Sequence, residues 1–174
     1  MEYEFTLKFM LPTASPDADE LVERLGEAGC SDALIGIGQP GRIALDFTRE
    51  AESAQQAVFS AMDEARHAIP EAKLIEVTPD FVGLSDVAEL VGVTRQNMRK
   101  LMLTHKATFP AAVHEGSVAL WHLCPVLKWL QERADYRIEP SLLEVAYIAM
   151  QINLAKEASQ IERRVQREVT ALVA

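Results

Sequence analysis

The sequence predicts an α+β protein, because strand-like and helix-like hydrophobic periods alternate over residues 1–80 and helical periods dominate the remainder. Over residues 1–80 the predicted order is strand, helix, strand, strand, helix, strand, which is the ferredoxin-like βαββαβ arrangement. A glycine-centred pair of short helical periods lies within residues 81–137, and a continuous helical period fills residues 138–174. We therefore expect an α+β domain, a smaller, mainly helical domain and a C-terminal helix.

The four strands are predicted from alternation of apolar and polar residues between turn residues. Residues 3–9 place an aromatic or leucine side chain at every second position, which is typical of a half-buried strand. Residues 33–37 and 42–47 flank the turn Gly38-Gln39-Pro40-Gly41 and predict a hairpin. Residues 73–77 supply the fourth strand.

Two helices are predicted between these strands. Residues 19–28 follow a break at residues 11–16, show apolar side chains at helical spacing, and are closed by Gly29. Residues 54–69 carry a second apolar stripe at the same spacing. These helices complete the predicted βαββαβ order.

The hairpin turn also contains the pattern G-x-G-x-x-G, formed by Gly36, Gly38 and Gly41. A dinucleotide site needs these glycines between a strand and the N-terminus of a helix. Here the last glycine precedes another strand, and Pro40 lies within the pattern. We interpret the glycines as turn residues and expect no cofactor.

Residues 84–103 predict two short helices joined at Gly92, with Ser85 as the N-cap of the first helix and Thr94 as the N-cap of the second. This is the layout of a helix-turn-helix, which places its second helix in the DNA major groove. An ordinary amphipathic helical hairpin is the alternative. The inward face of the second helix is expected to be Met98, Leu101 and Met102. The side chains expected to contact DNA are Thr94, Arg95, Gln96, Asn97, Arg99, Lys100, Lys106 and His114.

The residues that follow favour DNA binding. Residues 108–121 read as two short extended runs around a turn at Glu115-Gly116, and residues 122–133 resume a helical spacing with Pro125 in the first turn. Helix, turn, helix, β-wing and helix is the order of a winged helix-turn-helix.

A series of short motifs runs through this segment in the order Val87-Ala88-Glu89, Gly92-Val93-Thr94-Arg95, Phe109-Pro110, Trp121 and Trp129-Leu130. With these motifs, residues 84–133 resemble the excisionase and MerR-like group of small bacterial DNA-binding domains. The resemblance implies that the helix begun by Thr94 enters the major groove and that the wing touches the backbone or the minor groove. Wings of that family carry several arginines or lysines, whereas this wing offers only His114 beside Glu115.

Charge is distributed unevenly along the chain. The formal net charge of −9 would repel a polyanion. However, residues 1–80 contain 16 acidic and 6 basic residues, residues 81–137 contain 5 and 7, and residues 138–174 contain 5 and 4. The acidity therefore belongs to the first segment. The mildly basic middle segment predicts weak DNA binding by one copy, which a dimer on two half-sites would strengthen.

The remaining composition indicates a cytoplasmic protein without a metal site. No basic, apolar leader or membrane-spanning apolar run is apparent. Cys30 and Cys124 form no paired motif and are expected to be reduced packing thiols. His105, His114 and His122 lack metal-ligand spacing and are expected at a DNA-facing surface or in a solvated loop. No carboxylate pair or activated nucleophile indicates an enzyme.

Residues 139–174 predict one long helix whose apolar stripe needs a partner. A second copy of the helix is one partner, and the resemblance agrees because MerR-like proteins dimerise through a C-terminal helix. Packing across the chain's own N-terminal domain is the alternative. The residues expected at the dimer interface are Leu142, Val145, Ala149, Ile152, Ile161, Val165, Val169 and Leu172.

Together these observations predict a bacterial-type transcriptional regulator that binds double-stranded DNA sequence-specifically as a homodimer. The alternative is a protein-interaction adaptor or antitoxin-like partner whose acidic N-terminal domain binds another protein. The sequence leaves open whether that domain binds a protein or a small molecule.

Overall fold

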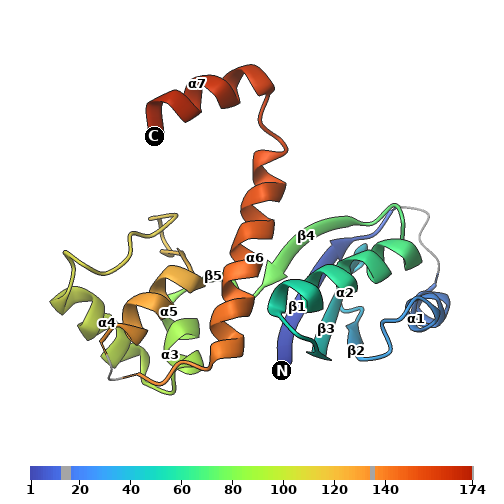
Figure 1. Cartoon of the computed structure of the whole chain (residues 1–174), viewed down its shortest axis with the longest axis horizontal. Helices are drawn as coiled ribbons and strands as arrows, with labels where there is room; N and C mark the ends of the chain where they lie inside the picture. Colours follow the sequence, from blue (N-terminus) through green and yellow to red (C-terminus); the bar gives the residue numbers. More distant parts are fainter. Residues whose placement is uncertain (13–16, 134–135, 174) are drawn as a thin grey trace.

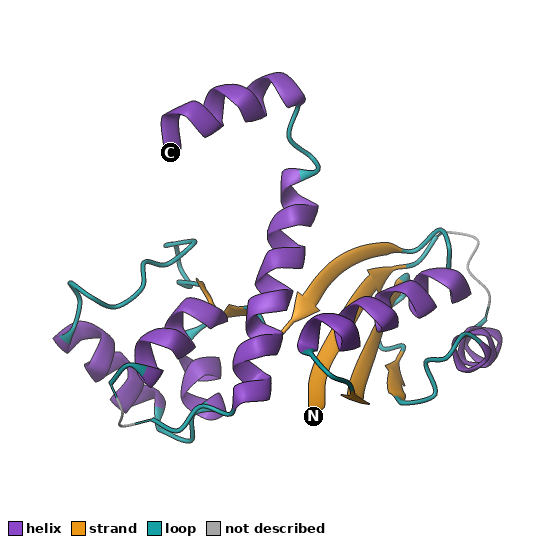
Figure 2. Ribbon diagram, in the orientation of Figure 1, coloured by secondary structure: helices purple, strands orange, loops and turns teal. Residues whose placement is uncertain are grey.

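The computed structural model describes residues 1–12, 17–133 and 136–173, and it is a mixed α+β structure (Figures 1 and 2). The predicted break at residues 11–16 falls mostly on residues 13–16, which lie outside the described residues. Buried side chains form two separate hydrophobic cores. We call residues 1–12 and 17–78 the sheet unit, and residues 81–133 the helical unit.

The sheet unit is a four-stranded antiparallel sheet in the order β2-β3-β1-β4, with helices packed on one face. The strand register places the apolar side chains of β1 and β3 on the same face of the sheet. Phe5 pairs with Phe47 and Leu7 with Leu45, and all four side chains point into one core. The opposite face carries charged and polar side chains. The elements are β1 (Glu2–Met10), α1 (Ala18–Glu27), β2 (Ala33–Gly36), β3 (Arg42–Glu50), α2 (Ala54–Ala68) and β4 (Lys73–Thr78).

The helical unit contains three helices and a two-stranded sheet. Its elements are β5 (Phe81–Val82), α3 (Leu84–Leu90), α4 (Arg95–Thr104), β6 (Trp121–His122) and α5 (Leu123–Gln131). The short strand β5, which we did not predict, pairs antiparallel with β6. The prediction of Ser85 as N-cap is wrong, because Gly83 occupies the N-cap of α3 and its N–H donates to Asp86 Oδ2 at 2.7 Å.

The segment between α4 and β6 has less strand structure than we predicted. Its described backbone holds one isolated bridge, between His114 and Leu120. Aromatic packing anchors the segment instead: Phe109 lies edge-on against Trp121 and Trp129, and Trp121 Nε1 donates to the Pro110 carbonyl at 3.0 Å. The tip of the segment is exposed.

Helix α6 (Pro140–Ala158) lies between the two units and packs against both (Figure 1). Val145 and Ala149 are fully buried in the core of the sheet unit, with Ile152 packed beside them. Ala146 is buried in the core of the helical unit, against which Leu142 also packs. A helix that is apolar on both sides belongs between two cores.

This packing corrects half of the predicted dimer interface. Leu142, Val145, Ala149 and Ile152 contact the chain's own cores, so their apolar stripe is already covered within one copy. That arrangement is the alternative that the sequence left open for this segment. A second copy cannot reach Val145 or Ala149, whose side chains have no exposed surface.

The prediction of one uninterrupted C-terminal helix is also wrong. Helix α6 ends at Ala158, and a separate helix, α7 (Arg163–Val173), projects clear of the body (Figure 1). The Ser159 hydroxyl donates to the Lys156 carbonyl at 2.6 Å, which is a local interaction that competes with helix continuation. No glycine or proline marks this break in the sequence.

A buried polar cluster fastens α6 to the outer edge of β4. Asn153 is 1 % exposed, and its amide accepts from the Val77 N–H at 2.9 Å and donates to the Val77 carbonyl at 2.8 Å. The same amide nitrogen donates to Asp80 Oδ2 at 2.8 Å, while the Lys156 ammonium donates to the Ile75 carbonyl. Helix α6 therefore satisfies backbone groups that an edge strand would otherwise leave unpaired.

Asp80 extends this cluster into the helical unit. Its carboxyl is fully buried, and Oδ1 lies 2.7 Å from His122 Nδ1. The Asp80 carbonyl accepts from the Leu123 N–H at 2.7 Å, at the start of α5. Our expectation that His122 lies at a DNA-facing surface or in a solvated loop is wrong, because its side chain is 12 % exposed and belongs to this junction.

Candidate nucleic-acid interface

Helix α4 is held by its cap and by one deeply buried side chain. Gly92 adopts φ +71°, a left-handed conformation that glycine accepts without strain, and so turns the chain from α3 toward α4. The Thr94 hydroxyl then accepts from the Asn97 N–H at 3.2 Å, as predicted for the N-cap. Met98 has no exposed surface, with Leu101 and Met102 partly buried beside it. The inward face of α4 is therefore confirmed.

The opposite face of α4 is polar and open to solvent. Every side chain on α4 that we expected to contact DNA is exposed, and the helix contains no acidic residue. Residues four apart lie on one side of a helix, so Arg95 lies beside Arg99 and Gln96 beside Lys100. The exposed residues at and on α4 are Thr94, Arg95, Gln96, Asn97, Arg99 and Lys100.

The basic residues of the middle segment fall into two groups. Lys128 lies over the Tyr147 ring, Arg133 stacks on Trp129 at 3.6 Å from the ring centroid, and Arg137 lies 3.8 Å from Glu139. The other four belong to α4 or the turn after it. Within the described residues, these four form neither an ion pair nor a side-chain hydrogen bond; they are Arg95, Arg99, Lys100 and Lys106.

Such unpaired cations are suited to binding a polyanion. A salt bridge within the protein would have to break before an arginine could contact phosphate, whereas a free guanidinium gains a partner without losing one. Arginine can also form two hydrogen bonds with a guanine edge. The arrangement of α4 thus provides the donors for both backbone and base contacts.

The remaining predicted contacts lie beside α4. Lys106 and Glu115 line an open cavity of about 620 Å³ between the end of α4 and the segment before β6. Most of its other walls are apolar, including Leu103, Phe109 and Trp121. His114 is exposed, and Glu115 next to it places a negative charge at the tip. This segment therefore contributes little positive charge, in agreement with its sequence.

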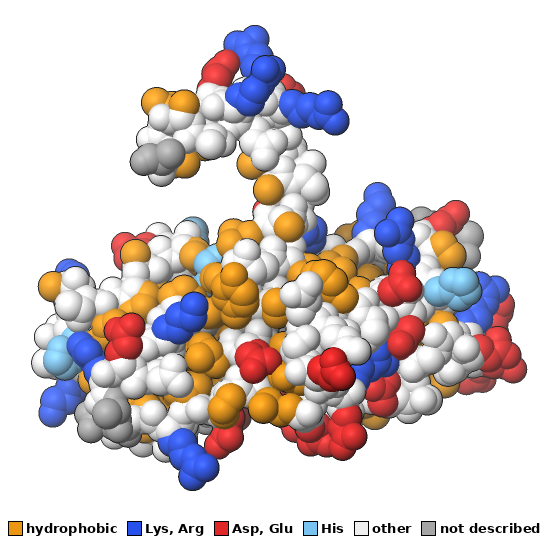
Figure 3. All heavy atoms as spheres, in the orientation of Figure 1, with side chains coloured by type: hydrophobic (Ala, Val, Ile, Leu, Met, Phe, Trp, Pro, Cys, Tyr) orange, Lys and Arg blue, Asp and Glu red, His pale blue; other side chains and the backbone are white. Residues whose placement is uncertain are grey.

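The two units differ in surface charge. Acidic side chains are dense over the sheet unit, on the right of Figure 3. An ion-pair network there is satisfied internally: Arg49 contacts both Asp32 oxygens at 2.7 and 2.8 Å and Glu64 at 2.7 Å. The Arg49 guanidinium lowers the pKa of the Asp32 carboxyl. This network joins β3 to α2 and to the residue before β2, and Arg49 Nη1 also donates to the Ser60 hydroxyl at 2.9 Å.

The cysteines and the possible metal ligands show no special arrangement among the described residues. Burial raises the pKa of the Cys30 thiol to about 11 and also raises that of Cys124, so neither cysteine is an activated nucleophile. In the same described ranges, no group of three or more histidine, cysteine, aspartate or glutamate side chains could hold a metal ion. Among the described residues, no helix combines the length and the apolar character that a membrane-spanning helix requires.

Comparison with known proteins gives no assignment: no protein-family model, no curated protein and no solved structure matches the chain.

Proposed function

We propose that the chain is a sequence-specific DNA-binding transcriptional regulator that acts as a dimer. The observation that carries the proposal is the exposed face of α4, where three of the four free cations of residues 81–133 lie on a helix without an acidic residue. The paired cations of the middle segment lie elsewhere. A basic helix that is capped at its N-terminus and packed through Met98, Leu101 and Met102 has the form of a recognition helix.

The architecture supports the finer fold assignments that belong to this proposal. The order β2-β3-β1-β4 with every neighbour antiparallel agrees with a ferredoxin-like sheet unit. In the helical unit, α3, α4, the bridge His114–Leu120 and α5 follow the order of a winged helix-turn-helix. The wing in this assignment is short and weakly charged, so α4 supplies most of the contacts to DNA.

Helix α7 is the part of the chain that we propose to form the dimer. Every residue of Ser159–Val173 is exposed, including the apolar Ile161, Val165 and Val169 on one side. Figure 3 shows basic side chains on its outer side. A helix of this length is marginal in water without tertiary contacts, which favours a partner for its apolar side. A second copy of α7 offers the same stripe.

Selection of bound duplexes from a random-sequence pool tests the proposed function. The full chain is expected to enrich one sequence, and fluorescence anisotropy should give an affinity for it roughly 10³-fold or more above that for a scrambled duplex. The affinity should fall steeply with salt, because each phosphate contact releases counterions. Equal binding of selected and scrambled duplexes would contradict sequence-specific recognition.

A double substitution on α7 tests the dimer. Ile161→Glu with Val165→Glu is expected to convert the dimer to folded monomers, because two added charges per copy would have to be buried at the interface. Light scattering measures the mass, and circular dichroism checks the fold. Gln160→Glu with Gln166→Glu is the matched control, since it adds the same charge at exposed polar positions of the same segment. A wild-type chain that is monomeric at micromolar concentration would refute the dimer.

The adaptor remains the second candidate, and one observation favours it. The sheet unit exposes a largely acidic surface that is unsuited to DNA (Figure 3). If the random-pool selection enriches nothing, a basic protein partner for this surface becomes the better proposal.

A further inference from the structure

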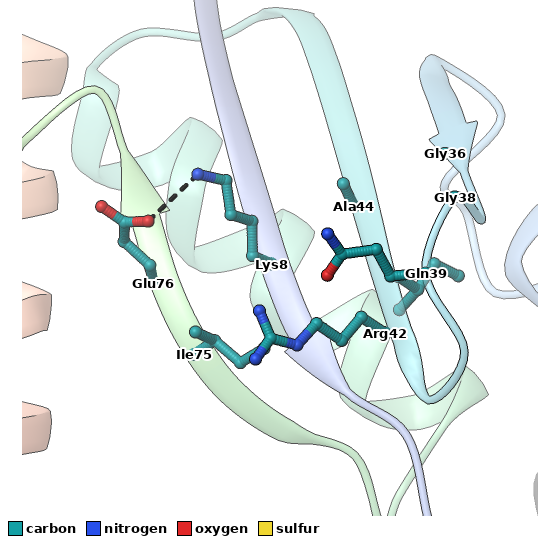
Figure 4. Close-up of a pocket in the computed structure, with 9 residues that line it drawn as sticks. Lys8, Gly36, Gly38, Gln39, Arg42, Ala44, Ile75 and Glu76 are labelled. Atoms are coloured by element: carbon teal, nitrogen blue, oxygen red, sulfur yellow. Dashed lines mark hydrogen bonds and ion pairs between the residues drawn. The ribbon is translucent and has the colours of Figure 1, made fainter.

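The solvent face of the sheet contains a hollow that the proposed DNA contacts do not use. It lies at the end of the sheet where the β2–β3 turn folds beside β3, and its volume is about 350 Å³ (Figure 4). The hollow lies on the far side of the sheet from α2, because Lys8 and Ala44 alternate along β1 and β3 with residues of the core. Ile43 also borders the hollow, although its side chain belongs to the core. Its lining includes Lys8, Gln39, Arg42, Ala44, Ile75 and Glu76.

Three residues with hydrogen-bond donors, from different elements, line this hollow. Figure 4 shows the Arg42 guanidinium extending from the start of β3 across β1 toward Ile75, with Gln39 from the turn beside it. Lys8 projects from β1, and its ammonium lies 3.0 Å from Glu76 Oε2 on β4. Within the described residues Arg42 has no ion pair and no side-chain hydrogen bond. Its charge is therefore available to a ligand.

Small residues keep the hollow open. Gly36 and Gly38 bring no side chain, and a Cβ added at Gly38 would meet nothing within 4 Å. Ala44 contributes only a methyl group between the donors, and Ile75 provides an apolar surface on the opposite side. The Gly-x-Gly pattern of the turn thus has a geometric consequence besides its turn conformation: it leaves room above β3.

We propose that this hollow binds a small molecule that carries a carboxylate or phosphate group. The guanidinium of Arg42 and the amide of Gln39 would bind the oxyanion, with Lys8 as the second positive charge. Ala44 and Ile75 would contact the apolar part of the ligand. One glutamate against two cations leaves the site locally positive within an otherwise acidic unit. This proposal goes beyond DNA binding, and its test does not depend on whether the chain binds DNA.

Amide chemical shifts of the full-length ¹⁵N-labelled protein test the site. Inorganic phosphate and succinate are titrated separately, each against sodium chloride at equal ionic strength, so that the two oxyanions are distinguished from general screening. At least one of them is expected to give saturable shifts in the roughly millimolar range, confined in the sheet unit to residues 8, 36–44 and 75–76. The oxyanion that saturates identifies the ligand group.

Two substitutions distinguish a specific oxyanion site from non-specific electrostatic attraction of anions to the protein. Arg42→Gln is expected to weaken binding about tenfold or more, because it removes a charged hydrogen-bond donor. Ala44→Leu keeps every charge of the site, but its larger side chain fills the hollow, so this variant should not bind the oxyanion. Arg66→Gln is the control, since it removes the same charge from an exposed position on α2. Shifts equal to those with chloride, or equal binding by Arg42→Gln and Arg66→Gln, would overturn the proposal.

Discussion

Replacing Asn153 by leucine is expected to lower the free energy of unfolding by about 3–5 kcal/mol. The amide of Asn153 satisfies both backbone groups of Val77 and one oxygen of Asp80, all without access to water. Leucine has a similar volume but leaves these three groups unpaired, and each buried polar group without a partner costs about 1–3 kcal/mol. Urea denaturation followed by circular dichroism measures the change.

The control for this prediction lies on the same helix. Gln151→Leu makes the same kind of change at an exposed position of α6 and should alter stability by less than about 0.5 kcal/mol. If both variants are equally stable, Asn153 does not hold α6 against the sheet. Ser at position 153 keeps some hydrogen-bonding capacity, so Asn153→Ser should be intermediate between the wild type and the leucine variant.

Removing the two arginines of α4 is expected to have the largest effect on DNA binding. Arg95→Ala and Arg99→Ala should each cost about 1–3 kcal/mol of binding free energy on the selected duplex. Both side chains are exposed and lack a partner within the described residues, so their loss leaves the fold intact. Fluorescence anisotropy measures the affinity, and thermal unfolding verifies that stability is unchanged.

Comparison of duplexes shows what each arginine does. A base-reading arginine should lose discrimination between the selected and scrambled sequences, whereas a phosphate-binding one should weaken both and reduce the salt dependence. Arg66→Ala on α2 removes the same charge from the sheet unit and should change neither affinity markedly. Unchanged affinity in both α4 variants would exclude α4 as the recognition helix.

Elements defined by local patterns were predictable from the sequence. Alternation placed β1, β2, β3 and β4 within a few residues of their observed bounds, and the glycine-containing turn gave the hairpin between β2 and β3. The Thr94 cap and the turn at Gly92 were also predicted, because caps and turns depend on residues close in the chain. The exposed cations of α4 followed from the same helical period.

Contacts between distant segments were not predictable in the same way. Strand β5 has only two residues and is stabilised by β6, so no local period marks it. Asp80, His122 and Asn153 come from three separate parts of the chain, and their pairing exists only once α6 lies beside β4. The polar Asn153 within the apolar period of α6 was the one available signal, because a polar residue on a buried face needs a partner.

The sequence by itself determined β1 to β4, the helices that precede the C-terminal segment and the basic face of α4, since each depends on interactions within a few residues. Only the tertiary structure decided the role of the C-terminal segment. An apolar stripe on a helix indicates that another surface covers it, but it does not identify that surface. The hydrophobic effect is non-directional, so any apolar surface of suitable shape can bury the stripe. In α6 the partners are the chain's own two cores, and the polar groups of β4 and Asp80 select that position. In α7 no described residue covers the stripe, and a second copy remains the partner that we propose.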